Sequence, residues 1–378
     1  MKVCFFVANL GDGGAQRQCV ALLNLLQHNQ NLDLHLMLLG PGEHEKDLDT
    51  SRLTIHRTTV RDFASPAALI FSIGTLRRIR PDLLISWLHP ADIWSYVATR
   101  VVHGIPWVIT ERGSSYPDQL VYNVRLRFGR WGATTIIANS EPGRQLWSSL
   151  SPSAPIVVIP NMLLGGALPT DRATAPARSQ ECLYVGRLEP QKNVDGMAAA
   201  FAHFAAARPE AKLTVVGKGA LAEQMRRIAE EAGVNGQMDL VGFRTDVPQL
   251  MSRARVLLSF SRNEGMPNVL MEAVVAGLPA VVSDIPEHHA LLGDNYPFYV
   301  ALDSAPEDAA RVIDRAWCAD DSALSQIYGH ARQVLASSKP EQVASAYTDT
   351  FSEIVAHRRP GGRGSRWLLR GIRGKRRR

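Results

Sequence analysis

The sequence predicts an α/β protein with two lobes, each a parallel sheet covered by helices on both faces. Short apolar segments, typical of strands buried on both faces, alternate with helical or polar segments along the chain. This pattern stops at a stretch of small, polar and proline residues, 165–180, and then starts again. The length of 378 residues also favours two cores, because domains average about 150 residues.

Composition excludes several classes of protein. The hydrophobic fraction of 46% and the charged fraction of 21% are those of a globular chain, not of a disordered or collagenous one. No apolar run is long enough for a membrane-spanning helix, and the one at the N-terminus is too short for a signal peptide. The four cysteines lie far apart, which argues against zinc and disulfides and fits a reducing cytoplasm.

The charge is unevenly distributed. Residues 358–378 contain ten Lys or Arg and no acid, so the rest of the chain has 32 basic and 36 acidic residues, a net charge of −4. Trp367, Leu368, Leu369 and Ile372 lie among these cations. A disordered, solvated tail is one interpretation. An anionic membrane surface is the partner that we favour, because interfacial basic residues contribute about 1 kcal/mol each. Nucleic acid is not expected, since the rest of the chain is acidic.

The first lobe, residues 1–164, opens with a buried strand at 3–8, a glycine-rich turn and a helix at 15–28, the beginning of a Rossmann-like unit. Further strands are expected at 34–39, 83–87, 106–110, 135–138 and 156–159. The second lobe, residues 181–339, repeats the pattern with strands at 182–185, 213–216, 256–260 and 280–283 and a helix at 220–232. A helix at about 340–357 follows.

Three segments in this frame contain residues suited to phosphate and sugar. Gly11, Gly13 and Gly14 end the first strand, where glycines allow close approach of a ligand and a helix N-terminus favours phosphate. Arg187 and Lys192 follow a strand of the second lobe and could neutralise a diphosphate. A tight turn without ligand and a solvated surface loop are the respective alternatives.

The third segment runs from Ser261 to Ala273. Asn268 is expected to cap a helix that ends at about Ala276 with Gly277 as its stop. Glu272 then lies one turn inside the helix, where a carboxylate suits ribose hydroxyls, and Glu264 lies in the preceding loop, where it suits sugar hydroxyls. Two ordinary acids near a helix start are the alternative interpretation.

Glu264 and Glu272 bracket seven residues within E-G-M-P-N-V-L-M-E-A-V-V-A-G-L-P. Together with V-G-R-L-x-x-x-K-N and the early G-G-A-Q-R-Q, this segment resembles the retaining glycosyltransferases of family 4, and the resemblance extends from Val3 to about Val355. It implies the GT-B fold, in which two Rossmann-like lobes face a central cleft. The helix at 340–357 would then pack back onto the first lobe.

The resemblance also implies a role for each matching residue. Arg187 and Lys192 would neutralise the leaving diphosphate, Glu272 would hold the ribose and Glu264 would bind the transferred sugar. The donor would also contact the residues of the loop and helix start and of the glycine turn: Gly265, Met266, Pro267, Asn268, Val269, Gly13 and Gly14.

Three further positions are assigned through the same resemblance. His89 follows a first-lobe strand and would lie near the donor sugar, where its alternative is a structural histidine. Arg112 follows another first-lobe strand and could bind an anionic acceptor or a donor phosphate, and Arg244 would lie near the nucleotide base. Neither a metal nor a cofactor is expected, since the nucleotide-sugar is the co-substrate.

Two possible metal motifs are discounted. Asp47-Leu48-Asp49 matches a metal-binding D-x-D, but it falls in a polar loop where a chance match is the better interpretation. His288 and His289 are neighbours near Glu287, and adjacent residues of a helix point apart.

The sequence thus predicts a retaining glycosyltransferase that moves a hexose or N-acetylhexosamine from a nucleotide-sugar, with a UDP-sugar favoured, to a lipid-linked or cell-surface glycan. It would be cytoplasmic and peripheral at the inner face of the cell membrane. The alternatives are a nucleotide-sugar epimerase of similar fold and a membrane-associated scaffold that binds nucleotide-sugar without transferring it.

Overall fold

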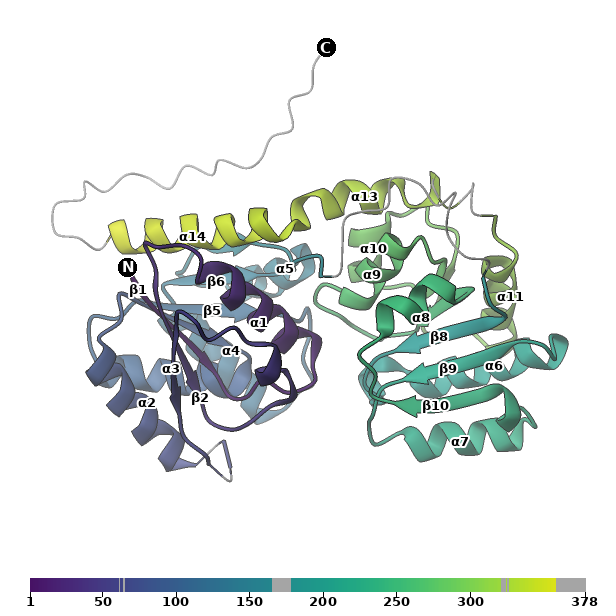
Figure 1. Ribbon diagram of the computed structural model, residues 1–378, viewed down its shortest axis with the longest axis horizontal. Coiled ribbons are helices and arrows are strands. Elements are labelled where there is room, and N and C mark those ends of the chain that lie inside the picture. Colours follow the sequence, from purple (N-terminus) through teal and green to yellow (C-terminus); the bar gives the residue numbers. More distant parts are fainter. Residues whose placement is uncertain (61, 64, 165–177, 321–323, 325, 358–378) are drawn as a thin grey trace, which may run out of the picture.

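The computed structural model describes residues 1–60, 62–63, 65–164, 178–320, 324 and 326–357. Two α/β lobes lie side by side in it, and the last two helices extend along both (Figure 1). The basic segment 358–378 and most of the expected linker, 165–177, lie outside the described residues. Within the described ranges, no helix is long and apolar enough to cross a membrane.

The first lobe is built on a seven-stranded parallel sheet in the order β3-β2-β1-β4-β5-β6-β7. The side chains of each strand alternate between the cores on the two faces of the sheet. In the first strand, Val3, Phe5 and Val7 pack on one face, and Cys4 and Phe6 pack on the other. The strands are β1 (Lys2–Val7), β2 (Asp33–Leu38), β3 (Leu53–Arg57), β4 (Leu83–Trp87), β5 (Trp107–Glu111), β6 (Thr135–Ala138) and β7 (Ile156–Val158).

Helices cover both faces of this sheet. Ser140 caps one of them by accepting the Gly143 amide at 3.2 Å. The helices are α1 (Gly14–Leu26), α2 (Pro66–Ile79), α3 (His89–Val101), α4 (Leu120–Gly132), α5 (Glu141–Ser149) and the 3-10 turn η1 (Glu43–Asp47).

The second lobe has a six-stranded parallel sheet in the order β10-β9-β8-β11-β12-β13, around a single continuous core. Its strands are β8 (Glu181–Val185), β9 (Lys212–Val216), β10 (Met238–Gly242), β11 (Val256–Ser259), β12 (Ala280–Ser283) and β13 (Tyr299–Val300). Its helices are η2 (Pro190–Lys192), α6 (Val194–Ala207), α7 (Ala222–Glu231), η3 (Asn235–Gln237), α8 (Val247–Arg253), α9 (Asn268–Ala276), α10 (Pro286–Leu292), α11 (Pro306–Trp317), α13 (Gly329–Leu335) and η4 (Ala336–Ser338).

The last described helix, α14 (Pro340–Ala356), returns to the first lobe. It packs against α1, and its Val343, Tyr347, Phe351 and Ile354 belong to the first-lobe core. The Leu163 amide donates to the Ser338 carbonyl at 2.8 Å, so the two segments that pass between the lobes run side by side.

The predicted fold class is confirmed: both lobes are doubly wound parallel sheets. Three strands were not predicted, β3, β10 and β13, and each lies at an edge of its sheet. Asn268 is the first residue of α9 instead of its cap, which is Pro267, whereas Gly277 ends the helix at a φ of 60° as expected.

The two strand orders place the site. In each sheet the first strands are added toward one edge and the later strands toward the other edge. This change of direction falls between β1 and β4 in the first lobe and between β8 and β11 in the second. In open α/β sheets, ligands bind beyond the carboxyl ends of the strands at such a switch point. The glycine turn, His89, Arg112, Arg187 and Glu264 all follow carboxyl ends of strands in the central part of the sheets.

Candidate active site between the lobes

The start of α1 meets the start of α9 across the junction of the lobes. A Cβ on Gly14 would lie 2.7 Å from the Asn268 Nδ2, so a larger residue at this position would displace the Asn268 side chain. The φ angles of Gly11, Gly13 and Gly14 are not in the left-handed region. Gly14 allows close approach to the second lobe, whereas Cβ atoms on Gly11 and Gly13 would meet only the nearby Asn9 and Gln16 side chains. The starts of α1 and α9, each with free backbone amides, therefore lie close together, which suits an anion.

Amide side chains tie these helix starts together. The buried Gln18 donates from Nε2 to the Met162 carbonyl at 2.8 Å and to the Asn268 Oδ1 at 3.3 Å. Asn161 donates from Nδ2 to the same Asn268 oxygen at 2.8 Å and to the Met266 carbonyl at 3.3 Å. Pro267 and the partly buried Val269 flank these contacts. The predicted donor-binding loop is therefore held against the first lobe.

The second glutamate of the motif forms an ion pair between the lobes. The Arg17 Nη1 of α1 lies 2.7 Å from the Glu272 Oε1 of α9. The Glu272 side chain is 13% exposed, and that of Arg17 is 42% exposed. Burial raises the pKa of Glu272, and the Arg17 charge offsets part of this effect. A ribose at Glu272 would have to replace this guanidinium.

The first glutamate is paired within the second lobe. The Glu264 Oε1 accepts from the Lys192 Nζ at 2.5 Å and from the Ser261 hydroxyl at 2.7 Å. Burial on its own would raise the pKa of Glu264, but Lys192 and these hydrogen bonds hold it below its usual range. Both bonds end on Oε1, and among the described residues none donates a hydrogen bond to Oε2. This oxygen is therefore available to a hydroxyl.

The two other predicted cations lie elsewhere. The Arg187 Nη1 lies 2.8 Å from Glu189, with the Arg187 side chain half-exposed. Arg244 forms a bidentate pair with Asp246, at 2.8 and 2.6 Å, on the surface. Among the described residues, neither arginine contacts the Lys192–Glu264 pair. Each would have to leave its neighbouring acid to reach a diphosphate or a base.

Gly265 touches the first lobe. A Cβ at this position would lie 2.1 Å from the Arg112 carbonyl oxygen and 3.0 Å from the Asn139 Nδ2. The Arg112 guanidinium lies over the Trp87 ring at 3.8 Å and donates to Asn161 at 3.0 Å and to the Tyr347 hydroxyl at 2.5 Å. Arg112 therefore connects the end of β5 to the segment that follows β7, which contains Asn161, and to α14, which contains Tyr347. Its buried Nε lacks a hydrogen-bond partner.

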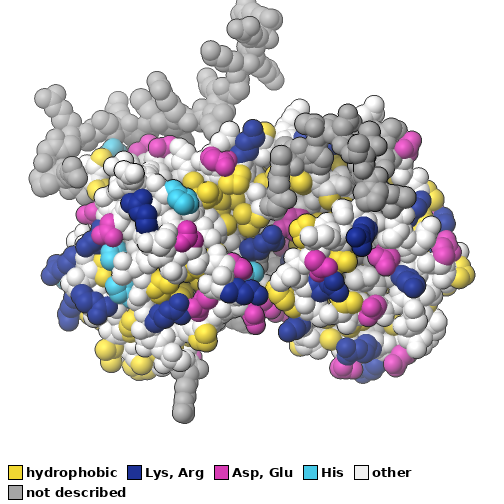
Figure 2. All heavy atoms as spheres, in the orientation of Figure 1, with side chains coloured by type: hydrophobic (Ala, Val, Ile, Leu, Met, Phe, Trp, Pro, Cys, Tyr) yellow, Lys and Arg dark blue, Asp and Glu magenta, His cyan; other side chains and the backbone are white. Residues whose placement is uncertain are grey.

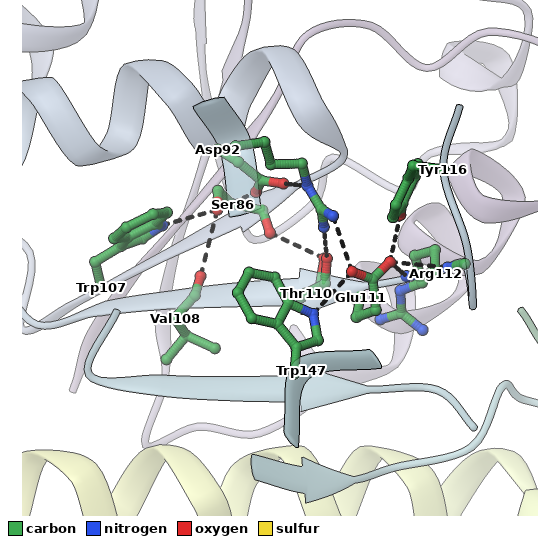
Figure 3. Close-up of polar contacts among 11 residues, drawn as sticks. Ser86, Asp92, Trp107, Val108, Thr110, Glu111, Arg112, Tyr116 and Trp147 are labelled. Atoms are coloured by element: carbon green, nitrogen blue, oxygen red, sulfur yellow. Dashed lines mark hydrogen bonds and ion pairs between the residues drawn. The ribbon is translucent and has the colours of Figure 1, made fainter. Parts of the chain in front are cut away.

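A buried charge network supports this loop (Figure 3). Glu111 accepts five hydrogen bonds: from the Arg112 and Gly113 amides and Tyr116 at one oxygen, and from Arg125 and Trp147 at the other. The Arg125 Nε also lies 2.6 Å from Asp92, and both side chains are at most 2% exposed. Arg112 and Gly113, in the loop that contacts Gly265, are thus hydrogen-bonded to Glu111, which is held in place at the end of β5.

His89 begins α3 directly after Leu88, which has a left-handed φ of 72°. Such a conformation costs about 1–3 kcal/mol in a non-glycine residue and is typical of functional sites. The His89 ring packs against Tyr122 at 5.2 Å between centroids. Burial, and then the charge of Arg125, lowers the pKa of His89, so its imidazole is neutral near pH 7.

Several residues of this region were not predicted as functional: Arg17, Gln18, Asn161, Glu111, Arg125, Glu287 and His288. Arg17 and Gln18 lie within the quoted G-G-A-Q-R-Q segment, one helical turn after the glycines, and that placement was an available signal. Figure 2 shows charged side chains of both signs gathered along the junction of the lobes. The contacts above identify which of them meet there.

Neither the Asp47–Asp49 motif nor the His288–His289 pair brings a metal-binding set of side chains together among the described residues. Asp47 pairs with His44 at 3.0 Å in η1, and His289 pairs with Asp284 and Asp294, whereas His288 is fully buried. In the ranges that the structure describes, no three His, Cys, Asp or Glu side chains are placed to hold one metal ion.

Two family models match the sequence, one for each lobe. Residues 12–163 match Glycosyltransferase Family 4, and residues 171–332 match Glycosyl transferases group 1. The lipopolysaccharide core biosynthesis glycosyltransferase LpsE of Rhizobium meliloti is 25% identical over 94% of this chain and 99% of its own length. A UDP-Gal:α-D-GlcNAc-diphosphoundecaprenol α-1,3-galactosyltransferase of Escherichia coli is 29% identical over 80% of this chain and 85% of its own length.

Some curated relatives are much longer: this chain covers 35% of one and 24% of another. Among solved structures, Anabaena HepE in complex with UDP-glucose aligns with a TM-score of 0.76 at 19% identity, over 93% of this chain and all of the HepE chain. At this identity the likeness concerns the fold.

Proposed function

Because its two lobes match Glycosyltransferase Family 4 and Glycosyl transferases group 1, the chain belongs to the GT-B glycosyltransferases, and we propose that it is a retaining enzyme acting on a nucleotide-sugar. It would transfer a hexose or an N-acetylhexosamine, with a UDP-sugar as the favoured donor. The acceptor would be a lipid-linked or cell-surface glycan, the kind of molecule that the galactosyltransferase relative glycosylates.

One observation supports this proposal above the others. The two glutamates of the motif lie at the junction of the lobes, each facing a cation: Glu272 faces Arg17 and Glu264 faces Lys192. A nucleotide-sugar contains the partners that could replace these contacts, since its ribose and sugar supply hydroxyls and its diphosphate supplies negative charge. An epimerase would instead need an acid/base set for water addition, and no such set stands out.

The mechanism follows from where charge develops. The bond between the anomeric carbon and the diphosphate oxygen breaks, and the negative charge grows on the leaving diphosphate. Lys192, Arg187 once it has left Glu189, and the amides at the starts of α1 and α9 stabilise that charge. These groups are the reason that we propose a transfer without a metal ion.

Retention of configuration requires attack from the face that the diphosphate leaves. In our proposal the acceptor hydroxyl forms the new bond to the anomeric carbon on that face, and its proton passes to the departing phosphate oxygen. Glu264 holds hydroxyls of the transferred sugar through Oε2, and the neutral His89 accepts or donates a hydrogen bond near it.

The donor is identified by thermal unfolding of the full chain with UDP-, GDP-, ADP- and TDP-sugars, each with and without EDTA. We expect one nucleotide to stabilise the protein, because a ligand at 100 times its dissociation constant adds about 2.7 kcal/mol. Stabilisation that survives EDTA agrees with the proposal. Stabilisation that vanishes with EDTA contradicts the metal-independent site. Stabilisation by none of the nucleotide-sugars contradicts the proposed donor site.

We also propose that the enzyme works at the inner face of the cell membrane through residues 358–378. On α4, Leu120 is 80% and Trp131 is 55% exposed, and Arg127 stacks on Trp131 at 4.4 Å, which suits an anionic surface. In co-sedimentation with anionic vesicles, the full chain should bind several-fold more than a chain ending at residue 357, and the difference should shrink in high salt. Equal binding of the two chains would contradict a role for residues 358–378.

A further inference from the structure

Helix α10 carries two adjacent buried polar side chains that the mechanism above does not use. Glu287 is 5% exposed, and His288 is fully buried. Both have one atom bonded within the protein and one buried atom, the Glu287 Oε2 and the His288 Nε2, without a partner. A buried polar atom left unpaired costs about 1–3 kcal/mol, so such atoms in a native protein call for an explanation.

The hydrogen bond of His288 to Ser283 determines which ring nitrogen carries the proton. Its Nδ1 lies 2.8 Å from the Ser283 carbonyl oxygen, which can only accept, so Nδ1 carries the proton. Burial lowers the pKa of His288, which keeps the ring neutral near pH 7. The free Nε2 is therefore a hydrogen-bond acceptor.

Glu287 reaches the other lobe. Its Oε1 accepts a hydrogen bond from the Ser114 hydroxyl, which belongs to the loop supported by Glu111. Its Oε2 is a second buried acceptor. Asn139, beside Gly265 on the first-lobe side of the junction, provides a third, since its Oδ1 is also buried without a partner.

These atoms belong to the same wall as the glutamate of the motif. The Ser283 hydroxyl donates to the Ser261 carbonyl, and the Ser261 hydroxyl donates to Glu264 at 2.7 Å. The same Ser283 accepts from His288 through its carbonyl oxygen, so hydrogen bonds through Ser283 and Ser261 connect the imidazole to Glu264. His288 and Asn139 therefore lie on the two sides of the Glu264–Gly265 loop, and Glu287, next to His288 on α10, contacts Ser114 of the first lobe.

The chemistry of the three atoms selects a ligand class. A partner must supply several donors and no negative charge, because an anion would meet the Glu287 carboxylate at close range. Sugar hydroxyls meet both conditions, and a hydroxyl oxygen can in addition accept a hydrogen bond from the unpaired Arg112 Nε. A phosphate does not fit.

We propose that Glu287, His288 and Asn139 form a subsite that binds hydroxyls of the transferred sugar and selects which sugar is used. The inference rests on the proposed function, since it assigns the subsite to the sugar of a nucleotide-sugar. In this proposal, Glu272, Lys192 and the helix starts bind the nucleotide diphosphate. Glu287, His288 and Asn139 determine which sugar is bound.

Two isosteric substitutions test the subsite. Glu287→Gln keeps an acceptor for Ser114 and turns the free acceptor into a donor. His288→Asn keeps a donor near the position of Nδ1 and removes Nε2. Dissociation constants are measured by calorimetry for the nucleoside diphosphate that stabilises the wild type and for its glucose, galactose and N-acetylglucosamine conjugates. His289→Asn and Glu307→Gln, at positions 28% and 57% exposed, are the matched controls.

We expect each subsite variant to bind the nucleoside diphosphate within about twofold of the wild type, and to lose about tenfold in affinity for the preferred sugar conjugate. Its preference among the three sugars should narrow, and its thermal stability without ligand should change little, because the hydrogen bond that each side chain makes within the protein is kept. Both controls should match the wild type.

Other outcomes overturn the inference in distinguishable ways. Variants that bind and rank the three conjugates as the wild type does overturn the subsite and leave the proposed function standing. An equal loss of affinity for the nucleoside diphosphate and its conjugates also overturns it, because the residues then act through the fold. A wild type that binds neither nucleoside diphosphates nor their sugars overturns the proposed function and the subsite together.

Discussion

Sugar transfer by the Glu264→Ala variant should fall about 10²–10³-fold below the wild type, the range found when one polar group facing the reacting centre is removed. Two effects combine in this substitution. The sugar loses the carboxylate oxygen that faces it, and Lys192, 19% exposed in its present ion pair, loses its partner and is free to move away from the diphosphate. Turnover is measured as release of the nucleoside diphosphate in the presence of acceptor.

The matched control is Glu223→Ala on α7, which also removes a glutamate from an ion pair, with Arg226, but at a position 80% exposed. An exposed pair contributes at most about 1 kcal/mol, so this variant should be as active as the wild type. Binding of the nucleoside diphosphate to Glu264→Ala should persist through Glu272 and the helix starts. Wild-type turnover in Glu264→Ala would refute the assignment of Glu264 to the transferred sugar.

The sequence was sufficient to predict the interior strands of both sheets and the edge strand β7, but not the other three edge strands. Strand β1 is apolar after its first residue, Lys2, because helices cover both faces of this central strand. Strand β3 lies at an edge and reads Leu-Thr-Ile-His-Arg, and β10 reads Met-Asp-Leu-Val-Gly, so polar residues interrupt the apolar pattern. The apolar periodicity that revealed the central strands is therefore absent from these two.

The candidate site was likewise predicted only in part. The family resemblance assigned Glu264, Glu272 and Lys192 to one donor cleft, and the positions of Glu264 and Lys192 after carboxyl ends of strands agree with this assignment. The sequence did not indicate that Arg17 pairs with Glu272, because 255 positions separate them and only the relative placement of the lobes brings them to 2.7 Å. Nor did it indicate that Arg187 turns to Glu189, which is a choice of rotamer.

Helix α4 shows why the supporting network was missed. It contains three arginines in the segment R-L-R-F-G-R, and nothing in their spacing identifies the one that is buried. Arg125 is 1% exposed and faces two acids contributed by other elements, whereas Arg127 and Arg130 are exposed. The burial of Arg125 depends on Asp92 and Glu111 meeting behind the same helix, and that is a property of the assembled lobe.

The largest loss of stability should follow replacement of Arg125 by alanine. This substitution leaves the carboxylates of Asp92 and Glu111, both fully buried, without the cation that faces them. Removing one partner from a buried ion pair costs about 3–5 kcal/mol, a large part of the stability of most proteins. Urea unfolding should show this loss. Arg127→Ala, two residues along the same helix and exposed, is the control and should cost less than about 1 kcal/mol.

The pH dependence of the same network gives a second, independent readout. Burial raises the pKa of Asp92 to about 6 even with Arg125 beside it. The folded state then binds more protons than the unfolded state between about pH 4 and 6, so the contribution of Asp92 to the unfolding free energy falls as the pH rises through that window. Asp92→Asn should abolish this slope, and below about pH 6 it should resemble the wild type, whose Asp92 is then protonated.

Activity links the network to the site. Glu111 fixes the Arg112 and Gly113 amides, and the Arg112 carbonyl limits the position of Gly265, next to Glu264. At a temperature where Arg125→Ala remains folded, its turnover should therefore fall about tenfold or more, because small displacements of catalytic groups have large effects on rate. Wild-type turnover in a destabilised Arg125→Ala would show that the network serves folding alone and that Gly265 is positioned from the second lobe.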